Sequence, residues 1–216
     1  PDLAAEIYAD IEFFARYGFN KCLPGDVEVV DAASGRLVRV EDVYRDPGLL
    51  HSTVTCDTDT LKLQAGAVSA VMDNGVKPVY RLTTALGRQI EATANHPFYT
   101  FEGWRLLEEL QVGDQIATPR RIPVEGRNEW PDYQVIALGR QLAEGGSTVD
   151  ALPAEVFTLT NRQIRLLLDQ LWGNALGGSR DGLTCVVASQ RLAQQLQHLC
   201  LRLGIVAQLS TVAGSY

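Results

Sequence analysis

Sulfur and long apolar runs are scarce in this chain of 216 residues. It has four cysteines and one methionine. The sequence contains no run of about 18 apolar residues, and no charged start that leads into a short apolar stretch, so we identify neither a membrane span nor a signal peptide. We therefore expect a cytoplasmic protein with no membrane partner. Because Met72 is the single methionine, we expect the chain to come from within a longer reading frame.

Residues that could bind a metal are few and scattered. The cysteines form no C-x-x-C pair, and the histidines lack the spacing of zinc ligands; they are Cys22, Cys56, Cys185, Cys200, His51, His96 and His198. We expect free thiols and no structural metal.

Composition and charge narrow the class of protein. A hydrophobic content of 46% suits packed cores and excludes disorder. Residues 22–132 carry 17 acidic and 11 basic side chains, whereas residues 133–216 carry 5 and 6. This balance argues against a nucleic-acid surface in the middle of the chain and leaves DNA binding by the tail open.

The spacing of apolar residues changes along the chain. Ile7, Ile11 and Phe14 have helical spacing, which predicts a helix over residues 2–19 that ends at Gly18. Short alternating runs such as VEVVD and PVYRLTT follow between residues 27 and 118, with glycine turns between them, and predict an all-β domain.

The last third of the chain is predicted to be mostly helical. Polar and proline-containing sequence at 121–132 predicts a linker. Helical periodicity then returns at 133–143, 162–171 and 190–203, with one expected strand at 184–189, TCVVAS.

Cys22 lies where the predicted helix meets the β domain, in a bend imposed by Pro24 and Gly25. Taken alone, it could be a small buried residue in a turn. Two later stretches favour a functional role: TANHPFYT places Thr93 and His96 three residues apart, and EGWRLLEELQVGDQI adds Gly103-Trp104 and a Leu-x-Val-Gly-Asp string.

These three stretches, in this order, resemble the Hint domain of inteins, the elements that carry out protein splicing. The resemblance implies a mostly β, horseshoe-like fold and an N-to-S acyl shift at the bond between Lys21 and Cys22. In that reaction Cys22 is the nucleophile, His96 protonates the leaving nitrogen, and Thr93 holds the amide or its oxyanion. An imidazole with an ordinary pKa near 6.5 suits this proton transfer. The resemblance implies no cofactor for splicing.

Alternatives remain for several of these residues. His96 could be a histidine satisfied within the core. For Asp26 and Asp114 we favour turn and capping roles, because Asp next to Gly is common in loops.

The stretch IYADIEFFARYGFNK, residues 7–21, resembles a segment of the bacterial DNA polymerase III alpha subunit. In that family Ser-His follows the string, and Cys22 stands in its place. The resemblance implies that residues 1–21 are a host fragment, or N-extein, that forms a helix and cannot polymerise DNA alone. The alternative is an arbitrary amphipathic helix.

Residues 133–216 resemble a LAGLIDADG homing endonuclease. VIALGRQLAEGGS matches its first signature helix, with Gly139 suited to close helix contact and Glu144 at the place of a metal-binding carboxylate. LPAEVF matches the short motif that precedes the second signature helix of that family. The sequence from 188 to 209 matches the helix and strand that follow this second signature helix. The second signature ends in Gly173 and Asn174 without an acidic residue, so we expect a degenerate α+β remnant. It would need a divalent metal such as Mg²⁺ only if its activity survives. Ordinary amphipathic helices are the alternative.

The resemblance implies four segments: a host fragment at 1–21, the N-terminal part of the Hint domain at 22–120, the linker at 121–132 and the incomplete endonuclease-like region at 133–216. The aspartate-bearing strand and terminal His-Asn pair of inteins do not occur before Tyr216. We therefore expect a C-terminal intein segment, downstream or on a second polypeptide, and polymerase III exteins as partners. The rival functions are a DNA endonuclease carried by the Hint domain and a Hint domain that only cleaves itself.

Overall fold

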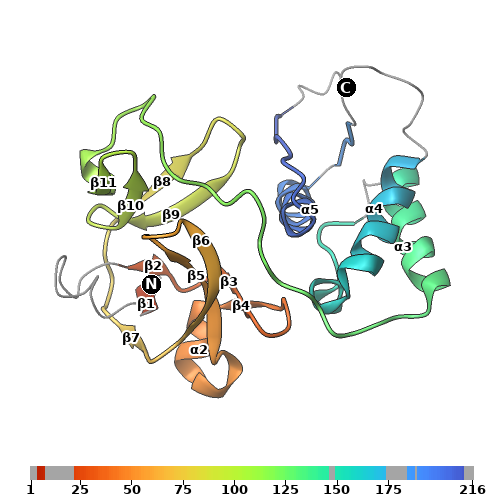
Figure 1. The fold of residues 1–216 in the computed structure, drawn as a ribbon, viewed down its shortest axis with the longest axis horizontal. Coiled ribbons are helices and arrows are strands. Elements are labelled where there is room, and N and C mark those ends of the chain that lie inside the picture. Colours follow the sequence, from red (N-terminus) through yellow and green to blue (C-terminus); the bar gives the residue numbers. More distant parts are fainter. Residues whose placement is uncertain (1–3, 8–21, 146–148, 174–183, 188, 212–216) are drawn as a thin grey trace. The chain divides into compact units, whose positions relative to one another are not determined.

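The computed structural model describes residues 4–7, 22–145, 149–173, 184–187 and 189–211. The chain forms two compact units (Figure 1). Unit 1 comprises residues 1–33 and 37–119, and unit 2 comprises residues 34–36 and 120–216. None of the described helices combines the length and the apolar character needed to cross a bilayer.

Unit 1 is built from short antiparallel strands, most of them paired as hairpins (Figure 1). One sheet has the order β2-β1-β7, and the other sheets are the pairs β3-β4, β5-β6, β8-β9 and β10-β11. The strands are β1 Ala4–Ile7, β2 Leu23–Pro24, β3 Glu28–Val30, β4 Leu37–Arg39, β5 Ser52–Asp57, β6 Lys62–Ala67, β7 Val71–Asp73, β8 Val79–Thr83, β9 Gln89–Thr93, β10 Pro97–Thr100 and β11 Gly103–Leu106. The β structure predicted for residues 27–118 is confirmed.

The helix predicted for residues 2–19 is wrong at its start, because residues 4–7 form strand β1. Ala5 pairs with Leu23 of β2 on one side and with Asp73 of β7 on the other. Both partners are distant in sequence, and their backbone hydrogen bonds outweigh the helix propensity of Ala and Glu, which is a small free energy per residue. Residues 8–21, which hold most of the predicted helix, lie outside the described residues.

The core of unit 1 forms where β3, β4 and the short helix α2 (Val40–Arg45) meet. Val29 pairs with Val38 across the β3-β4 hairpin, and Val38 clusters with Val43 and Leu50. The three clustered side chains are at most 3% exposed. Successive side chains of a strand point to opposite faces, so Val29 and Val38 lie on the same face of the hairpin. Helix α2 covers this face. Two 3₁₀ helices complete unit 1: η1 Pro47–Leu49 and η2 Leu107–Glu109.

Unit 2 is helical in its described residues (Figure 1). Its elements are α3 Asp132–Gly145, the 3₁₀ helix η3 Ala154–Thr158, α4 Asn161–Gly173 and α5 Gln190–Arg202. The three predicted helices are confirmed. The strand predicted at 184–189 is not formed by residues 184–187, and residues 205–209 are not a strand either. A strand needs a partner to satisfy its backbone groups, and no described neighbour supplies one.

Gly139 sets the approach of α3 to α4, which lie side by side in Figure 1. A Cβ atom at this position would lie 2.6 Å from Cβ of Gln170 and 2.7 Å from the carbonyl oxygen of Leu167. Only glycine therefore fits this crossing without a shift of α4. The close helix contact predicted at Gly139 is confirmed.

Arg202, at the end of α5, is fully buried and organises the segment before α4. Its guanidinium donates to the carbonyl oxygen of Phe157, to that of Leu159 at 3.1 Å and to Oδ1 of Asn161 at 3.0 Å. Burial lowers the pKa of Arg202 to about 10. These bonds satisfy carbonyl groups that η3 leaves without intrahelical partners.

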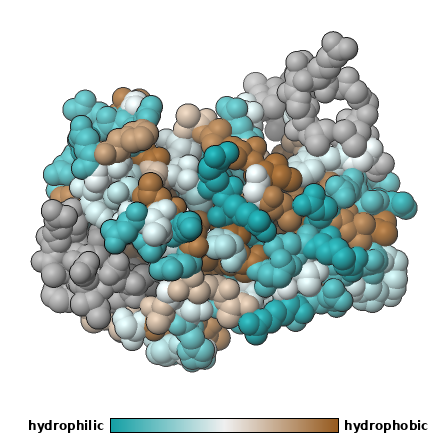
Figure 2. Space-filling model, in the orientation of Figure 1, coloured by the Kyte–Doolittle hydropathy of each residue, from teal (hydrophilic) through white to brown (hydrophobic). Residues whose placement is uncertain are grey.

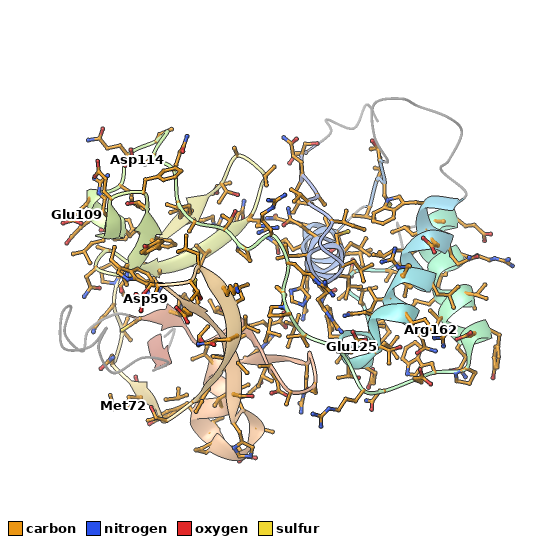
Figure 3. The ribbon with its side chains drawn as sticks, viewed as in Figure 1. Asp59, Met72, Glu109, Asp114, Glu125 and Arg162 are labelled. Carbon is orange, nitrogen blue, oxygen red and sulfur yellow. The ribbon has the colours of Figure 1, made fainter. Side chains whose placement is uncertain are left out.

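The segment at 121–132, which its composition led us to interpret as a linker, is packed within unit 2. Ile122 and Val124 are buried, and the amide of Ile122 donates to the carbonyl of Leu201 at 3.2 Å. Glu125 and Arg162 both lie near the start of α4 (Figure 3). The Glu125 carboxylate accepts from the first amide of that helix, Asn161 N, at 2.7 Å.

Candidate functional site

Cys22 lies immediately before β2 and is 0% exposed. The bend predicted after it is present, since the amide of Val27 donates to the Pro24 carbonyl at 3.1 Å. The amide of Glu41, in α2, donates to the Gly25 carbonyl at 2.8 Å. The turn is therefore attached to the core, and it fixes the direction in which the chain leaves Cys22.

Thr93, the last residue of β9, bonds to the main chain of Cys22. The Cys22 amide donates to Oγ1 of Thr93 at 3.0 Å. The Thr93 amide donates to the Cys22 carbonyl at 3.1 Å, and the Thr93 hydroxyl approaches the same carbonyl at 3.4 Å. Both residues are buried, so these bonds form with little competition from water. The structure thus brings together two residues that are 71 positions apart.

His96 follows in the turn between β9 and β10. Its amide donates to the Thr93 carbonyl at 2.9 Å, and its own carbonyl accepts from Leu107 N at 2.8 Å. The imidazole packs edge-on against Phe98, with ring centroids 5.6 Å apart. His96 is therefore held by its backbone on both sides and is linked to Cys22 through Thr93. Lys21, the other side of the expected scissile bond, lies outside the described residues.

Two residues that the sequence did not single out as functional contact the sulfur of Cys22. Nδ2 of Asn74 lies 3.5 Å and Nζ of Lys77 lies 3.6 Å from Sγ. Both belong to the segment between β7 and β8. We predicted only a turn at Asp73-Asn74-Gly75, and no local pattern reveals that this turn faces Cys22. The contact depends on strand pairing that is distant in sequence.

The turn and capping role favoured for Asp114 agrees with its contacts. Its Oδ2 accepts from the amide of Gln111 at 2.9 Å and from Arg105 at 3.3 Å. Asp114 and Glu109 lie close to β11 in Figure 3. Asp26 is exposed in the turn after β2. Trp104 of β11 packs edge-on against Tyr99 of β10, with centroids 5.2 Å apart, so the Gly103-Trp104 motif belongs to this hairpin.

Glu144, the residue expected to hold an endonuclease metal, is exposed near the end of α3. In the described parts of the chain no three His, Cys, Asp or Glu side chains are grouped as a metal site. The end of the second signature, beyond Gly173, lies outside those parts. The structure therefore places Glu144 on the exposed side of a helix, outside any such three-residue group of the described residues.

A sequence profile of the family described as "Intein splicing domain" matches residues 31–203. The chain belongs to this family. Cys22 lies nine residues before the matched region, and Thr93 and His96 lie within it.

Curated relatives of this intein domain include replication proteins. The chain is 38% identical over 145 residues to replicative DNA helicase DnaB of Rhodothermus marinus. It is 34% identical over 161 residues to the DnaB helicase of a Nostoc species. The aligned parts cover 67% and 72% of this chain but only 15% and 18% of those proteins.

Solved structures of DnaB inteins are also similar. The Ssp DnaB mini-intein variant M86 is 37% identical, with a TM-score of 0.44 over 47% of this chain and 62% of that one. A DnaB intein from Synechocystis is 37% identical, with a TM-score of 0.43 over 47% of this chain and 70% of that one.

Proposed function

We propose that this intein domain catalyses its own splicing, and that the first step is an N-to-S acyl shift at the Lys21–Cys22 bond. The observation that carries the proposal is the bonding of Thr93 to both the amide and the carbonyl of Cys22. The Cys22 amide is the leaving nitrogen of this shift. Its hydrogen bond to Oγ1 of Thr93 holds the nitrogen in place while the bond to Lys21 is attacked.

The step balances with the residues at this site. Sγ of Cys22 loses its proton and bonds to the carbonyl carbon of Lys21, and the bond from that carbon to the Cys22 nitrogen breaks. His96 supplies a proton to the departing nitrogen, which becomes an amine. Because a thioester is less stable than an amide, the site must bind the distorted bond better than the planar one.

The test uses the full chain and its Cys22→Ala variant. Incubated with dithiothreitol, the wild type releases residues 1–21 as a thioester-derived product, which mass spectrometry detects. The Cys22→Ala variant releases none. Cys56→Ala is the matched control, because Cys56 is an exposed cysteine of β5, and it releases the fragment at the wild-type rate. Cleavage that persists in Cys22→Ala would refute the proposal.

We further propose that a C-terminal intein segment completes unit 1 as a horseshoe-like Hint domain and supplies the later steps. Support comes from the paired strands: apart from β2-β1-β7, each sheet of the described residues has only two strands. Val79 and Tyr80 of β8 are 39% and 54% exposed, and Figure 2 shows apolar residues reaching the surface among hydrophilic ones. Added strands would cover such edges and residues.

For the host we propose a cytoplasmic DNA polymerase III alpha subunit, because residues 7–21 resemble a segment of that protein. The curated relatives are named as a different replication protein, the helicase DnaB, so the host sequence on either side of the intein must identify the host. The gene should continue past the codon for Tyr216 through an aspartate-bearing strand and His-Asn, and then resume with Ser-His as the polymerase does. A helicase-like sequence after His-Asn would overturn this host.

The second candidate is a LAGLIDADG endonuclease in unit 2. The observation that favours it is the close crossing of α3 and α4 at Gly139, which suits paired signature helices. Cleavage of an intein-free host gene that requires Mg²⁺ and is lost in Glu144→Gln would support it. We expect no cleavage, because Glu144 alone is a poor clamp for the metals that phosphodiester hydrolysis needs.

A further inference from the structure

The segment between β7 and β8 directs two nitrogen donors at one sulfur atom. Asn74 Nδ2 lies 3.5 Å and Lys77 Nζ lies 3.6 Å from Sγ of Cys22. Both side chains are partly buried. A cation in such a place is screened less by water and salt than one at the surface.

Strand pairing explains why these donors reach Cys22. Ala5 of β1 pairs with Leu23 on one side and with Asp73 on the other, so β2 and β7, which adjoin Cys22 and Asn74, flank the same strand. On the other side, Val79 of β8 pairs with Thr93 of β9. Lys77 precedes Val79 by two residues and therefore lies beside the residue that bonds to the Cys22 main chain.

The turn itself holds Asn74 and Lys77 in place. Gly75 has a φ of +71°, a left-handed conformation that favours glycine, and its amide donates to Oδ1 of Asp73 at 2.8 Å. The Asp73 carboxylate thus bonds within its own turn. Asn74 and Lys77 flank Gly75 in this segment, and the side chains of both approach the same sulfur atom.

We propose that Lys77 is a catalytic residue of the acyl shift, with Asn74 as its neutral partner. Resting on the splicing function proposed above, this inference adds the group that stabilises charge on the nucleophile. The thiol proton leaves to solvent, and the Lys77 ammonium and the Asn74 amide hold the resulting thiolate. The sulfur then attacks the Lys21 carbonyl as described, while Lys77 keeps its proton throughout. His96 delivers a proton to nitrogen and regains one from solvent.

The other charged groups of this neighbourhood have separate roles. His96 belongs to the turn after β9, where we assign it to the leaving nitrogen. Glu91 of β9 accepts two hydrogen bonds from Arg81, at 2.6 and 2.9 Å. The Asp73 carboxylate bonds to Gly75, and Lys77 directs its ammonium at Sγ.

The experiment measures thiol-induced release of residues 1–21 from the full chain between pH 6 and 9. Lys77→Met removes the cation and should slow release about tenfold at pH 7, since the reacting sulfur loses one charge-assisted contact. The deficit should shrink as the pH rises, because hydroxide then generates the thiolate without help. Lys77→Arg keeps the charge and should retain at least half of the rate.

Two further variants separate charge from packing. Asn74→Asp is nearly isosteric but places a carboxylate beside the sulfur, so it should slow release by repelling the charge that develops there. Lys62→Met, in exposed β6, is the matched control and should leave the rate unchanged. A deficit in Lys77→Met that is equal at every pH, or no deficit at all, would overturn the proposal.

A second measurement separates this inference from the splicing proposal. If the wild type shows no Cys22-dependent release, splicing fails, and the rate at which Cys22 reacts with iodoacetamide at pH 7 is then measured by mass spectrometry. Cys22 should react more slowly in Lys77→Met than in the wild type, because the cation beside the reacting sulfur is lost. Equal rates would show that Lys77 does not stabilise charge on the sulfur, whatever the outcome for splicing.

Discussion

Thr93 holds the main chain of Cys22 on both sides of its α-carbon. Its hydroxyl accepts from the Cys22 amide at 3.0 Å, and its own amide donates to the Cys22 carbonyl at 3.1 Å. A rotation of Cys22 about its backbone would break at least one of these bonds. The pair therefore fixes the residue while leaving its sulfur directed toward Asn74 and Lys77.

The first prediction concerns the Thr93 hydroxyl. Thr93→Val keeps the shape of the side chain but leaves the buried Cys22 amide without its acceptor. An unsatisfied buried donor costs about 1–3 kcal/mol, so we expect thiol-induced release of residues 1–21 to slow by roughly tenfold or more. Thr93→Ser keeps the hydroxyl and should retain most of the rate.

Thr100→Val is the matched control for this prediction. Thr100 is also a buried threonine, but its hydroxyl donates to the Gly103 carbonyl at 2.8 Å within the β10-β11 hairpin. This substitution should lower stability without slowing release at a temperature where the chain stays folded. Equal slowing by the two valine variants would mean that Thr93 acts only through stability.

The second prediction tests the helix crossing at Gly139. Gly139→Ala would gain about 1 kcal/mol from helix propensity in an open site. At this crossing the new Cβ lies 2.7 Å from the Leu167 carbonyl, and overpacking of this kind costs about 1–3 kcal/mol. We expect a net loss of stability in urea unfolding followed by circular dichroism.

Gly173→Ala gives the comparison, because a Cβ at the end of α4 would meet no atom within 4 Å. This variant should be as stable as the wild type or up to about 1 kcal/mol more stable, because alanine has the higher helix propensity. A Gly139→Ala variant as stable as the wild type would show that α3 and α4 can separate freely.

Local pattern predicted most of the elements. The hairpin β3-β4 follows from alternation around a glycine turn, and α4 follows from apolar residues at helical spacing, Ile164, Leu167, Leu168 and Leu171. Cys22, Thr93 and His96 were singled out by a family resemblance, which supplies their order and roles. The structure adds the hydrogen bonds between the first two.

The failures share one cause, which is pairing between residues distant in sequence. Strand β1 exists because β2 and β7 flank it, and neither is visible from residues 4–7. Lys77 looks like a surface lysine in its local sequence. Arg202 looks like a basic residue that completes a helix end, yet it is fully buried, which is rare for an arginine.

The third prediction follows from the burial of Arg202. Arg202→Met removes the donor shared by Phe157 O, Leu159 O and Oδ1 of Asn161. Leaving buried acceptors unsatisfied should destabilise unit 2 by about 3 kcal/mol or more, measured by urea unfolding. Arg165→Met, on the exposed face of α4, should change stability by less than about 0.5 kcal/mol. Similar losses in both variants would mean that the buried bonds contribute little.

The last prediction uses Cys200 of α5, which is 1% exposed. Burial raises the pKa of its thiol to about 11, from 9.0. The unfolded chain therefore loses this proton at lower pH than the folded chain does. Stability is unaffected below pH 9 and falls as the pH rises from 9 toward 11, because deprotonation then favours the unfolded state. Between pH 9 and 10 the loss from this group should be about 1 kcal/mol.

The contribution of Cys200 is isolated by comparing how steeply stability falls with pH in matched variants. Other groups also titrate above pH 9, so the absolute loss in the wild type mixes several causes. Cys200→Ala removes the thiol and should reduce the loss between pH 9 and 10 by about 1 kcal/mol, although it is less stable at neutral pH because of the cavity. Cys56→Ala, which removes an exposed thiol, should keep the wild-type slope. If Cys200→Ala and the wild type lose stability equally with pH, the thiol ionises as easily in the folded chain as in the unfolded one. Burial in α5 would then not protect it.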